Sequence, residues 1–179
     1  FPSPNKGWVL VRGLESPDQS SIWLLRTTDG GYNWTTYKDL PFENGYMQFL
    51  DDTNGFVMAG QGGGMHKQAI QLYQTSDGGA TWTLKYAIDP TQPVNTLPFG
   101  GLKNALTFRD LSTGWIGGYS PESGSVYLYK TTDGGLTWAR QPLPLPAGSE
   151  TADFTTTAPT FFGPNDAVLP VWRSTSAGR

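Results

Sequence analysis

One eight-residue sequence occurs three times in this chain of 179 residues: "TTDGGYNW" from residue 27, "TSDGGATW" from residue 75 and "TTDGGLTW" from residue 131. Upstream of each copy, an aromatic residue is followed six positions later by Gly and a second aromatic residue. These triplets are Phe1 with Gly7 and Trp8, Phe49 with Gly55 and Phe56, and Phe108 with Gly114 and Trp115. A fourth unit starts at Phe161, so successive units start 48, 59 and 53 residues apart. This period is typical of the four-stranded blades of a β-propeller.

The composition between the repeats favours short strands over helices. The chain contains 23 Gly and 14 Pro with aromatic residues in short runs between them, and no stretch free of Gly and Pro has helical spacing of apolar residues. In the third unit, strands are expected at residues 105–108, 114–119, 125–131 and 137–143. The predicted fold class is all-β: a β-propeller of four-stranded antiparallel blades, with about three and a half blades present. The expected blades of this single propeller segment are residues 1–40, 41–90, 91–146 and 147–179, the last incomplete.

The repeated octapeptide has the chemistry of a tight hairpin turn. Its Asp can accept hydrogen bonds from the backbone amides that follow, its two glycines can take positive φ angles, and the Ser or Thr before the Asp adds a hydroxyl acceptor. Its Trp is expected to pack beneath the turn. Because a catalytic or calcium site would not ordinarily recur in every blade, a structural role is favoured. The residues concerned are Asp29, Gly30, Trp34, Asp77, Gly78, Trp82, Asp133, Gly134 and Trp138.

The pattern Ser/Thr-x-Asp-Gly-Gly-x-Thr-Trp resembles the Asp-box, also called the bacterial neuraminidase repeat, which is found in sialidases, xyloglucanases, sortilin-type receptors and photosystem II assembly factors. The wider pattern, Phe-x5-Gly-Trp-x-x-Gly leading into Leu-Tyr-x-Thr-x-Asp-Gly-Gly-x-Thr-Trp, is most similar to the repeats of the photosystem II stability/assembly factor family and its bacterial relatives. The resemblance covers nearly the whole chain and implies a β-propeller. Asn33 stands where Thr is usual and Ser76 occupies a freely exchanged position, so neither residue threatens the hairpin.

The charge and residue inventory excludes several classes of function. With 12 Lys and Arg against 15 Asp and Glu, the net charge of −3 supplies no basic surface for nucleic acid. No apolar run is long enough to span a bilayer. The chain has no Cys, which excludes disulfides, thiolate catalysis and Cys-based metal sites. We expect no cofactor and no bound metal. The resemblance implies a bacterial protein with an extracytoplasmic location (secreted, periplasmic or lumenal), although no signal peptide is visible.

A binding face is expected at one end of the blades. If the strands of a blade are called A to D in chain order, the A–B and C–D turns lie at one end, and the B–C loops and the connections between blades lie at the other. The octapeptide is the C–D turn. Long segments are expected at the opposite end, at residues 60–71, 87–104, 119–125 and 142–160. Because binding residues gather on such loops, His66, Lys67 and Glu122 are candidates for the binding face.

The chemistry of this face is sparse. A lone His in a Gly-rich loop is more often solvated than a ligand or a base. Trp8, Phe56 and Trp115 recur once per blade, so we expect them in the core and not stacked on sugars. The sequence alone does not pair any two carboxylates at the spacing of a glycosidase, and it designates no catalytic residue. The carboxylates scattered over different loops are Glu43, Asp89, Glu122, Glu150 and Asp153.

Two classes of function remain open. The first is a non-enzymatic scaffold or binding module that engages a protein or polysaccharide partner through its long-loop face, as the closest resemblance implies. The second is a glycoside hydrolase of sialidase or xyloglucanase type, since those enzymes share the Asp-box. Sialidases resemble one another in an early Arg-Ile-Pro signature and in three arginines that clamp a carboxylate, and this sequence has no such signature. Several of its six arginines fall on expected strands or tight turns. The six are Arg12, Arg26, Arg109, Arg140, Arg173 and Arg179.

An arc of about three and a half blades would leave an apolar face exposed at each end. The A strand near Phe161 could complete the first blade, but the sequence after it continues into a second strand. We therefore expect either a piece of a longer propeller or two copies that join their arcs as a dimer, and we favour the first alternative.

Overall fold

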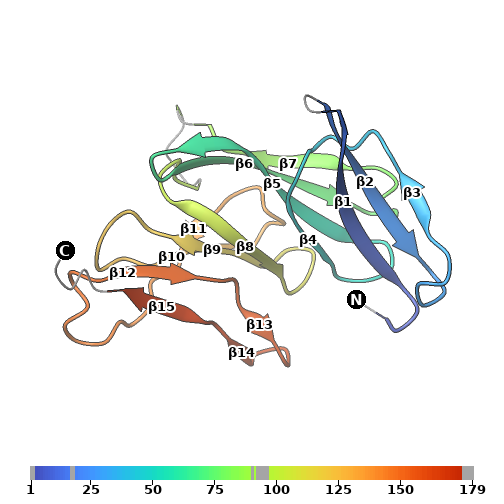
Figure 1. The fold of residues 1–179 in the computed structure, drawn as a ribbon. Helices are drawn as coiled ribbons and strands as arrows, with labels where there is room; N and C mark the ends of the chain where they lie inside the picture. The colour runs from blue at the N-terminus through green and yellow to red at the C-terminus, as the bar shows by residue number, and fades with distance from the viewer. Residues whose placement is uncertain (1–2, 17–18, 90, 92–96, 175–179) are drawn as a thin grey trace. The chain divides into compact units, whose positions relative to one another are not determined.

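The computed structural model describes residues 3–16, 19–89, 91 and 97–174, which form antiparallel strands and turns without a helix in these ranges (Figure 1). The all-β prediction is confirmed. Two compact units contain these strands: Phe1–Gly60 with Gln71–Lys85, and Gln61–Ile70 with Tyr86–Arg179. The strands are β1 (Gly7–Ser16), β2 (Gln19–Thr27), β3 (Thr35–Tyr37), β4 (Tyr46–Phe49), β5 (Gly55–Gly64), β6 (Lys67–Thr75), β7 (Thr83–Ala87), β8 (Leu102–Phe108), β9 (Gly114–Tyr119), β10 (Tyr127–Thr131), β11 (Ala139–Arg140), β12 (Asp153–Thr156), β13 (Thr160–Phe161), β14 (Ala167–Val168) and β15 (Val171–Ser174).

The strand order follows the repeat. β4, β5, β6 and β7 are neighbours in chain order, and β8, β9, β10 and β11 pair in the same way. The first repeat contributes β1, β2 and β3, with β1 and β2 side by side along most of their length (Figure 1). The fourth repeat is one long hairpin, in which β12 pairs with β15 and β13 pairs with β14 nearer the turn (Figure 1). Among the described strands, the second repeat (β4–β7) and the third repeat (β8–β11) therefore have all four strands, A to D. The first repeat has strands B to D, and the fourth repeat has strands A and B.

The aromatic–Gly spacing of the repeat corresponds to the A–B hairpin. Phe49 is paired with Gly55, and Phe108 is paired with Gly114, at the turn end of each hairpin. The Phe ring lies over the glycine, since a Cβ at Gly55 or Gly114 would come within 2.8 Å or 2.7 Å of a ring carbon. Glycine is therefore required where the ring covers the neighbouring backbone.

The prediction of a long loop at residues 60–71 is wrong, because this segment is the hairpin of β5 and β6. β5 ends at Gly64 and β6 begins at Lys67, so Met65 and His66 alone form the turn, with φ angles of 53° and 59°. Positive φ at both central residues suits the twist of a two-residue hairpin. The Gly-rich sequence has a different cause: a Cβ at Gly63 would lie 2.1 Å from the Lys67 carbonyl oxygen, so glycine permits the close approach of the strands.

Other predicted ranges need smaller corrections. The strand expected at 125–131 begins at Tyr127, and the one expected at 137–143 is only Ala139–Arg140. The predicted loop 87–104 contains the start of β8, while its residues 90 and 92–96 lie outside the described residues. The predicted loop 142–160 contains β12, whose alternate residues Phe154 and Thr156 are buried. The polar sequence "DFTT" concealed this strand.

Each unit has its own buried cluster. The prediction that Trp8, Phe56 and Trp115 are core residues is confirmed, because they are 6%, 0% and 6% exposed. The cluster in the first unit consists of Phe42, Val57, Ala59 and Tyr73. The cluster in the second unit consists of Trp115, Val126, Leu128, Ala152 and Phe154.

The contact between β8 and β9 gives a direct test of this packing. A Cβ at Gly118 would lie 1.7 Å from the Leu102 carbonyl oxygen, which is backbone within the strand pair. We expect Gly118→Ala to lower the free energy of unfolding by roughly 2 kcal/mol or more, measured by urea denaturation with tryptophan fluorescence. Gly64→Ala is the matched control, because its Cβ would meet nothing within 4 Å. Equal losses in the two variants would contradict the packing.

Candidate functional site

The octapeptide at the end of strand C is a self-contained hydrogen-bonded turn. In the third repeat, Asp133 Oδ1 accepts hydrogen bonds from the backbone amides of Leu136 (3.0 Å) and Thr137 (2.9 Å). The Thr131 hydroxyl donates to Asp133 Oδ1 (2.7 Å) and accepts from the amide of Gly135 (2.9 Å). Trp138 Nε1 donates to the Gly135 carbonyl oxygen at 3.1 Å. Corresponding bonds from the second repeat join Thr75, Asp77, Gly79, Thr81 and Trp82.

Asn33 in the first octapeptide keeps the bonds that Thr makes elsewhere. Its backbone amide donates to Asp29 Oδ1 at 2.9 Å, and its side-chain Nδ2 donates to Asp29 Oδ2 at 2.7 Å. The Thr81 hydroxyl makes the equivalent bond to Asp77 Oδ2 at 2.6 Å. The exchange of Thr for Asn therefore replaces one donor with another at the same carboxylate oxygen.

The first glycine of each octapeptide fastens the C–D turn to the A–B turn. Both glycines of each copy have φ between 74° and 93°, which glycine adopts without strain. The first glycine donates its amide to a carbonyl oxygen of the A–B turn at 2.8 Å in all three repeats. The pairs are Gly30 with Asn5, Gly78 with Thr53, and Gly134 with Ser112. The two turns at this end of a repeat are thus held together by the backbone.

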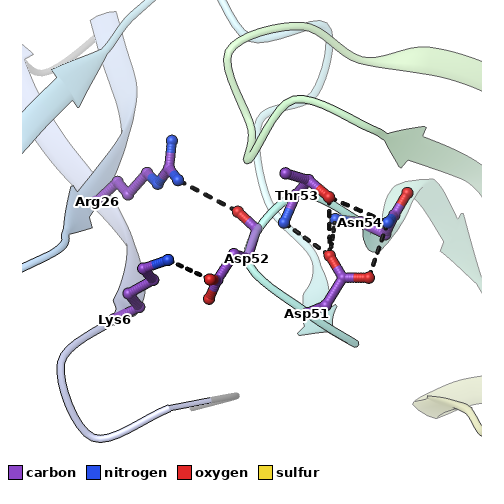
Figure 2. A network of polar contacts seen from close by, with 6 residues as sticks. All are labelled: Lys6, Arg26, Asp51, Asp52, Thr53 and Asn54. Atoms are coloured by element: carbon purple, nitrogen blue, oxygen red, sulfur yellow. Dashed lines mark hydrogen bonds and ion pairs between the residues drawn. The ribbon is translucent and has the colours of Figure 1, made fainter.

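The A–B turn has a carboxylate of its own, which the sequence analysis missed. Asp51 accepts from the amides of Thr53 and Asn54, both at 2.7 Å, and from the Asn54 side chain at 2.8 Å (Figure 2). Asp110 accepts from the amides of Ser112 (2.9 Å) and Thr113 (2.7 Å) in the third repeat. Each Asp stands two residues after the Phe that ends strand A, and this Phe-x-Asp spacing is the signal that identifies it.

Basic residues of the first repeat contact the A–B turn of the second repeat within the first unit. Figure 2 shows Lys6 and Arg26 directed at Asp52: Lys6 forms an ion pair with its carboxylate, and Arg26 donates to its carbonyl oxygen at 3.2 Å. The Arg26 guanidinium also lies 5.7 Å from the Trp8 ring, and Trp8 stacks on Phe49 with centroids 3.8 Å apart. These contacts hold the first and second repeats together at this end of the first unit.

The second unit uses the same arrangement. Lys130 lies 5.3 Å from the ring of Trp115, which is its cross-strand neighbour. Arg26 and Trp8 are cross-strand neighbours in the same way. Trp115 in turn contacts the Phe161 ring at 5.0 Å, so a strand-B Trp meets the strand-A Phe of the following repeat in both units. A cation, a Trp and a Phe therefore form a recurring structural group.

Hydrogen bonds keep the turn carboxylates ionised. The backbone amide and side chain of Asn33 lower the pKa of Asp29 from 3.8 to about 2. Burial raises the pKa of Asp77, but the side-chain and backbone bonds from Thr81 outweigh burial and lower the pKa to about 2. The side-chain bond from Asn54 lowers the pKa of Asp51 well below its ordinary value. A general acid needs a pKa near the working pH, so these carboxylates suit a structural role.

The three Trp residues of the octapeptides differ in burial, although each donates from Nε1 to the carbonyl oxygen of the second glycine of its own turn. Trp138 is 2% exposed, and its ring meets Phe108 with centroids 6.2 Å apart. Trp82 is half-buried and meets Phe49 at 6.1 Å. Trp34 is 41% exposed. The equivalent aromatic residue, Phe1, lies outside the described residues.

The candidates for the binding face, His66, Lys67 and Glu122, belong to one region of the second unit. The His66 carbonyl oxygen accepts a bond from the Gly101 amide at 2.8 Å, and Lys67 pairs with Gly100. Gly100 and Glu122 line the same pocket. Within the described part of the chain, His66 and Lys67 thus contact the wall that carries Gly100 through their backbone, while Glu122 is itself a lining residue.

The pocket has a volume of about 190 Å³ and lies at the loop end of the third repeat. Tyr127 and Tyr129 lie on the same face of β10, with ring centroids 4.7 Å apart. Arg140 on β11 is the direct cross-strand partner of Tyr129. Arg140 donates a hydrogen bond to the Ser125 hydroxyl. The complete lining is Pro98, Gly100, Ser120, Pro121, Glu122, Ser125, Val126, Tyr127, Tyr129 and Arg140.

Lys103 lies behind this pocket with its ammonium enclosed by backbone carbonyls. It is 1% exposed, and its Nζ lies 5.4 Å from the ring of Tyr127. Burial lowers the pKa of Lys103 from 10.5 to about 8. The hydrogen bonds join the start of β6 to the segment before β8, so they fix the wall that carries Gly100. Nζ donates to the carbonyl oxygens of Gln68 (2.9 Å), Phe99 (3.2 Å), Gly100 (3.3 Å) and Gly101 (3.0 Å).

Sequence reasoning missed Tyr127, Tyr129, Arg140 and Lys103. The two tyrosines in "YLYKT" stand two residues apart, which places them on one face of a strand. That spacing was available in the sequence, but the partner across the sheet was not. In the described residues, no group of three or more His, Cys, Asp and Glu side chains could hold a metal ion. No helix in the same residues is long and apolar enough to cross a membrane.

Removal of one turn carboxylate tests the structural role of the octapeptide. Asp133→Ala leaves two backbone amides and the Thr137 hydroxyl without their acceptor. We expect a loss of about 1 to 2 kcal/mol in the free energy of unfolding, measured by chemical denaturation. Asn33→Thr is the control, because Thr accommodates the same bonds in the other two repeats and should leave stability nearly unchanged. A stable Asp133→Ala variant would contradict the role.

The lowered pKa values predict acid sensitivity. A carboxylate with a lowered folded-state pKa contributes stability that is present above its unfolded pKa, and that stability is lost as the pH falls through the folded pKa. For Asp29 and Asp77 this window runs from about pH 4 to about pH 2. Thermal midpoints should therefore fall steeply between these values. Asp77→Asn should be less stable than the parent chain at pH 6 and approach it at pH 2, and a constant difference would contradict the assignment.

No protein-family model matches the chain. The chain is 28% identical over 155 residues to a xyloglucanase from a Paenibacillus species, in a match that covers 75% of this chain and 14% of that enzyme. A solved structure of YCF48 bound to D1 peptide matches with a TM-score of 0.51 and 16% identity, covering 100% of this chain and 53% of the other. A GH74 enzyme from Niastella koreensis matches with a TM-score of 0.50 and 20% identity, covering 97% and 27%. The chain thus spans between one seventh and about half of these proteins. Together with the strand order, the comparisons show that the chain has a β-propeller fold.

Proposed function

We propose that this chain is a non-enzymatic module that binds a polymeric partner through the loop end of its third repeat. The observation that carries the proposal is the pocket of about 190 Å³, in which two Tyr side chains meet Arg140 and Glu122. Binding sites are typically concave, with aromatic walls and a few convergent polar groups. The opposite end of the repeats is occupied by carboxylates that already hold backbone amides.

The comparisons support a polymer as the partner. The name of the Paenibacillus relative denotes a polysaccharide substrate, and YCF48 is described as bound to a peptide. The higher sequence identity belongs to the xyloglucanase, which favours a polysaccharide partner for this chain and, with it, the extracytoplasmic location expected from the sequence.

A binding role fits the charges of the pocket better than a hydrolytic role. Glycoside hydrolases ordinarily use two carboxyl groups on opposite sides of the scissile bond, about 5 to 9.5 Å apart. Glu122 is the single carboxylate among the described residues that line the pocket. A lone carboxylate can orient a ligand but cannot supply both the acid and the base or nucleophile.

The second candidate function is glycoside hydrolysis, favoured by the 28% identity to a xyloglucanase. It requires a second carboxyl group from outside the described pocket lining. Glu122 would then act as one member of the pair, and its removal would abolish turnover.

Affinity electrophoresis and product analysis separate the two functions. We expect the purified chain to migrate more slowly in gels containing xyloglucan, while chromatography of the incubated polymer shows no new oligosaccharides. Xylan, mixed-linkage β-glucan and a gel without polymer serve as comparisons. Release of oligosaccharides that disappears with Glu122→Gln would decide for the hydrolase. Unchanged migration in every polysaccharide gel would contradict the binding proposal.

A further inference from the structure

We propose that the pocket at the loop end of the third repeat binds one neutral sugar ring, such as a terminal or branch residue of a polysaccharide. This inference rests on the proposed binding function and names the ligand class of the same site. The pocket volume of about 190 Å³ sets the size of the ligand. It lies below the roughly 300 to 1,000 Å³ of pockets that take drug-sized molecules, so the pocket suits one ring and not several.

The charges of the lining favour a neutral ligand. Arg140 is the only basic residue and Glu122 the only acidic residue among the described lining residues, so their formal charges cancel. An anionic or cationic ligand would meet a like charge as well as an opposite one. A sugar hydroxyl is both a donor and an acceptor, so neighbouring hydroxyls can accept from the guanidinium and donate to the carboxylate.

The tyrosines supply the apolar surface that a sugar ring requires on its C–H face. Tyr127 is 3% exposed and Tyr129 is half-buried, so Tyr129 is the more accessible of the two side chains. Because Arg140 is paired with Tyr129 across β10 and β11, the guanidinium and this ring lie on the same face of the sheet. The apolar surface of Tyr129 and the polar guanidinium of Arg140 are therefore adjacent, so one sugar ring can contact both.

The pocket is held in place by bonds that do not involve a ligand. Ser125 accepts a hydrogen bond from Arg140, which orients the guanidinium. The Glu122 amide donates to the Ser120 hydroxyl at 3.2 Å, and the Gly124 amide donates to the Ala152 carbonyl oxygen at 2.7 Å. On the other wall, the carbonyl cage of Lys103 includes Gly100. Such preorganisation lowers the ordering cost of binding a small, weakly held ligand.

The Tyr127 hydroxyl gives independent support. It is buried and has no hydrogen-bond partner among the described residues. An unpaired buried hydroxyl costs stability, and such groups in native proteins often have a functional explanation. Tyr127 is thus a lining residue of the pocket that carries an unsatisfied polar group.

The test uses saturation-transfer NMR with D-xylose, D-galactose and D-glucose, and isothermal titration calorimetry with xyloglucan oligosaccharides. We expect Arg140→Met and Glu122→Gln each to weaken binding about 10-fold or more, because each removes a charge-assisted hydrogen bond. Tyr129→Phe keeps the ring and should bind within about twofold of the parent chain, whereas Tyr129→Ala should lose binding. Arg12→Met and Glu43→Gln, both at exposed positions of the first unit, are matched controls that should bind as the parent does. Thermal midpoints confirm that each variant is folded.

The outcomes separate this inference from the proposed function. If the polymer is bound but Arg140→Met and Glu122→Gln bind it as the parent chain does, the sugar pocket and the placement of binding at the loop end of the third repeat are both wrong, and only the polymer-binding function itself stands. If the parent chain binds a peptide library and no sugar, the ligand class is overturned. If it binds neither class, both proposals fail.

Discussion

The structure depends on the bond between the first glycine of each octapeptide and the carbonyl oxygen of the A–B turn. This bond measures 2.8 Å in three repeats, and it joins the turns of two hairpins whose inner strands, B and C, are also paired along the sheet. The glycine can make it because φ near 75° turns its amide outward, and the Thr and Asp beside it hold that geometry by accepting the neighbouring amides. Strands A to D of a repeat are therefore fixed at one end by backbone chemistry that is independent of what lies at the other.

The loops at the opposite end of the repeats can vary because the octapeptide turns already hold the strands in place. Its loops differ in length and sequence between repeats, and in the third repeat they enclose a pocket between Pro98, Glu122 and Arg140. The buried Lys103 ammonium shows how such a loop is held without a regular strand, since it draws four carbonyl oxygens around one cation. Burial of the Lys103 ammonium lowers its pKa, because removing a charge from water costs free energy. The loop is therefore held in place despite this cost.

The sequence predicted the elements that carry a local signal and missed those that depend on distant partners. Gly114–Tyr119 was predicted to the residue because β-branched, aromatic and Gly positions mark both its ends. The hairpin of β5 and β6 was missed because Gly62, Gly63 and Gly64 have the composition of a loop, and the close approach of Lys67 that explains Gly63 is a tertiary contact. In the candidate site, Glu122 was named from its loop, whereas Tyr127 and Arg140 stood on strands and were assigned to the scaffold.

The sequence by itself determined the repeat, the all-β fold and the residues of the octapeptide turn, because those properties follow from φ preferences and from bonds that span at most four residues. Tertiary structure alone decided which side chains share a surface. Tyr129 and Arg140 are eleven positions apart and become neighbours only through the register of β10 and β11. Glu122 reaches the same pocket because the Gly124 amide is bonded to Ala152, in a different repeat. Register and loop anchoring are properties of pairs of distant segments, and no local pattern of residues specifies them.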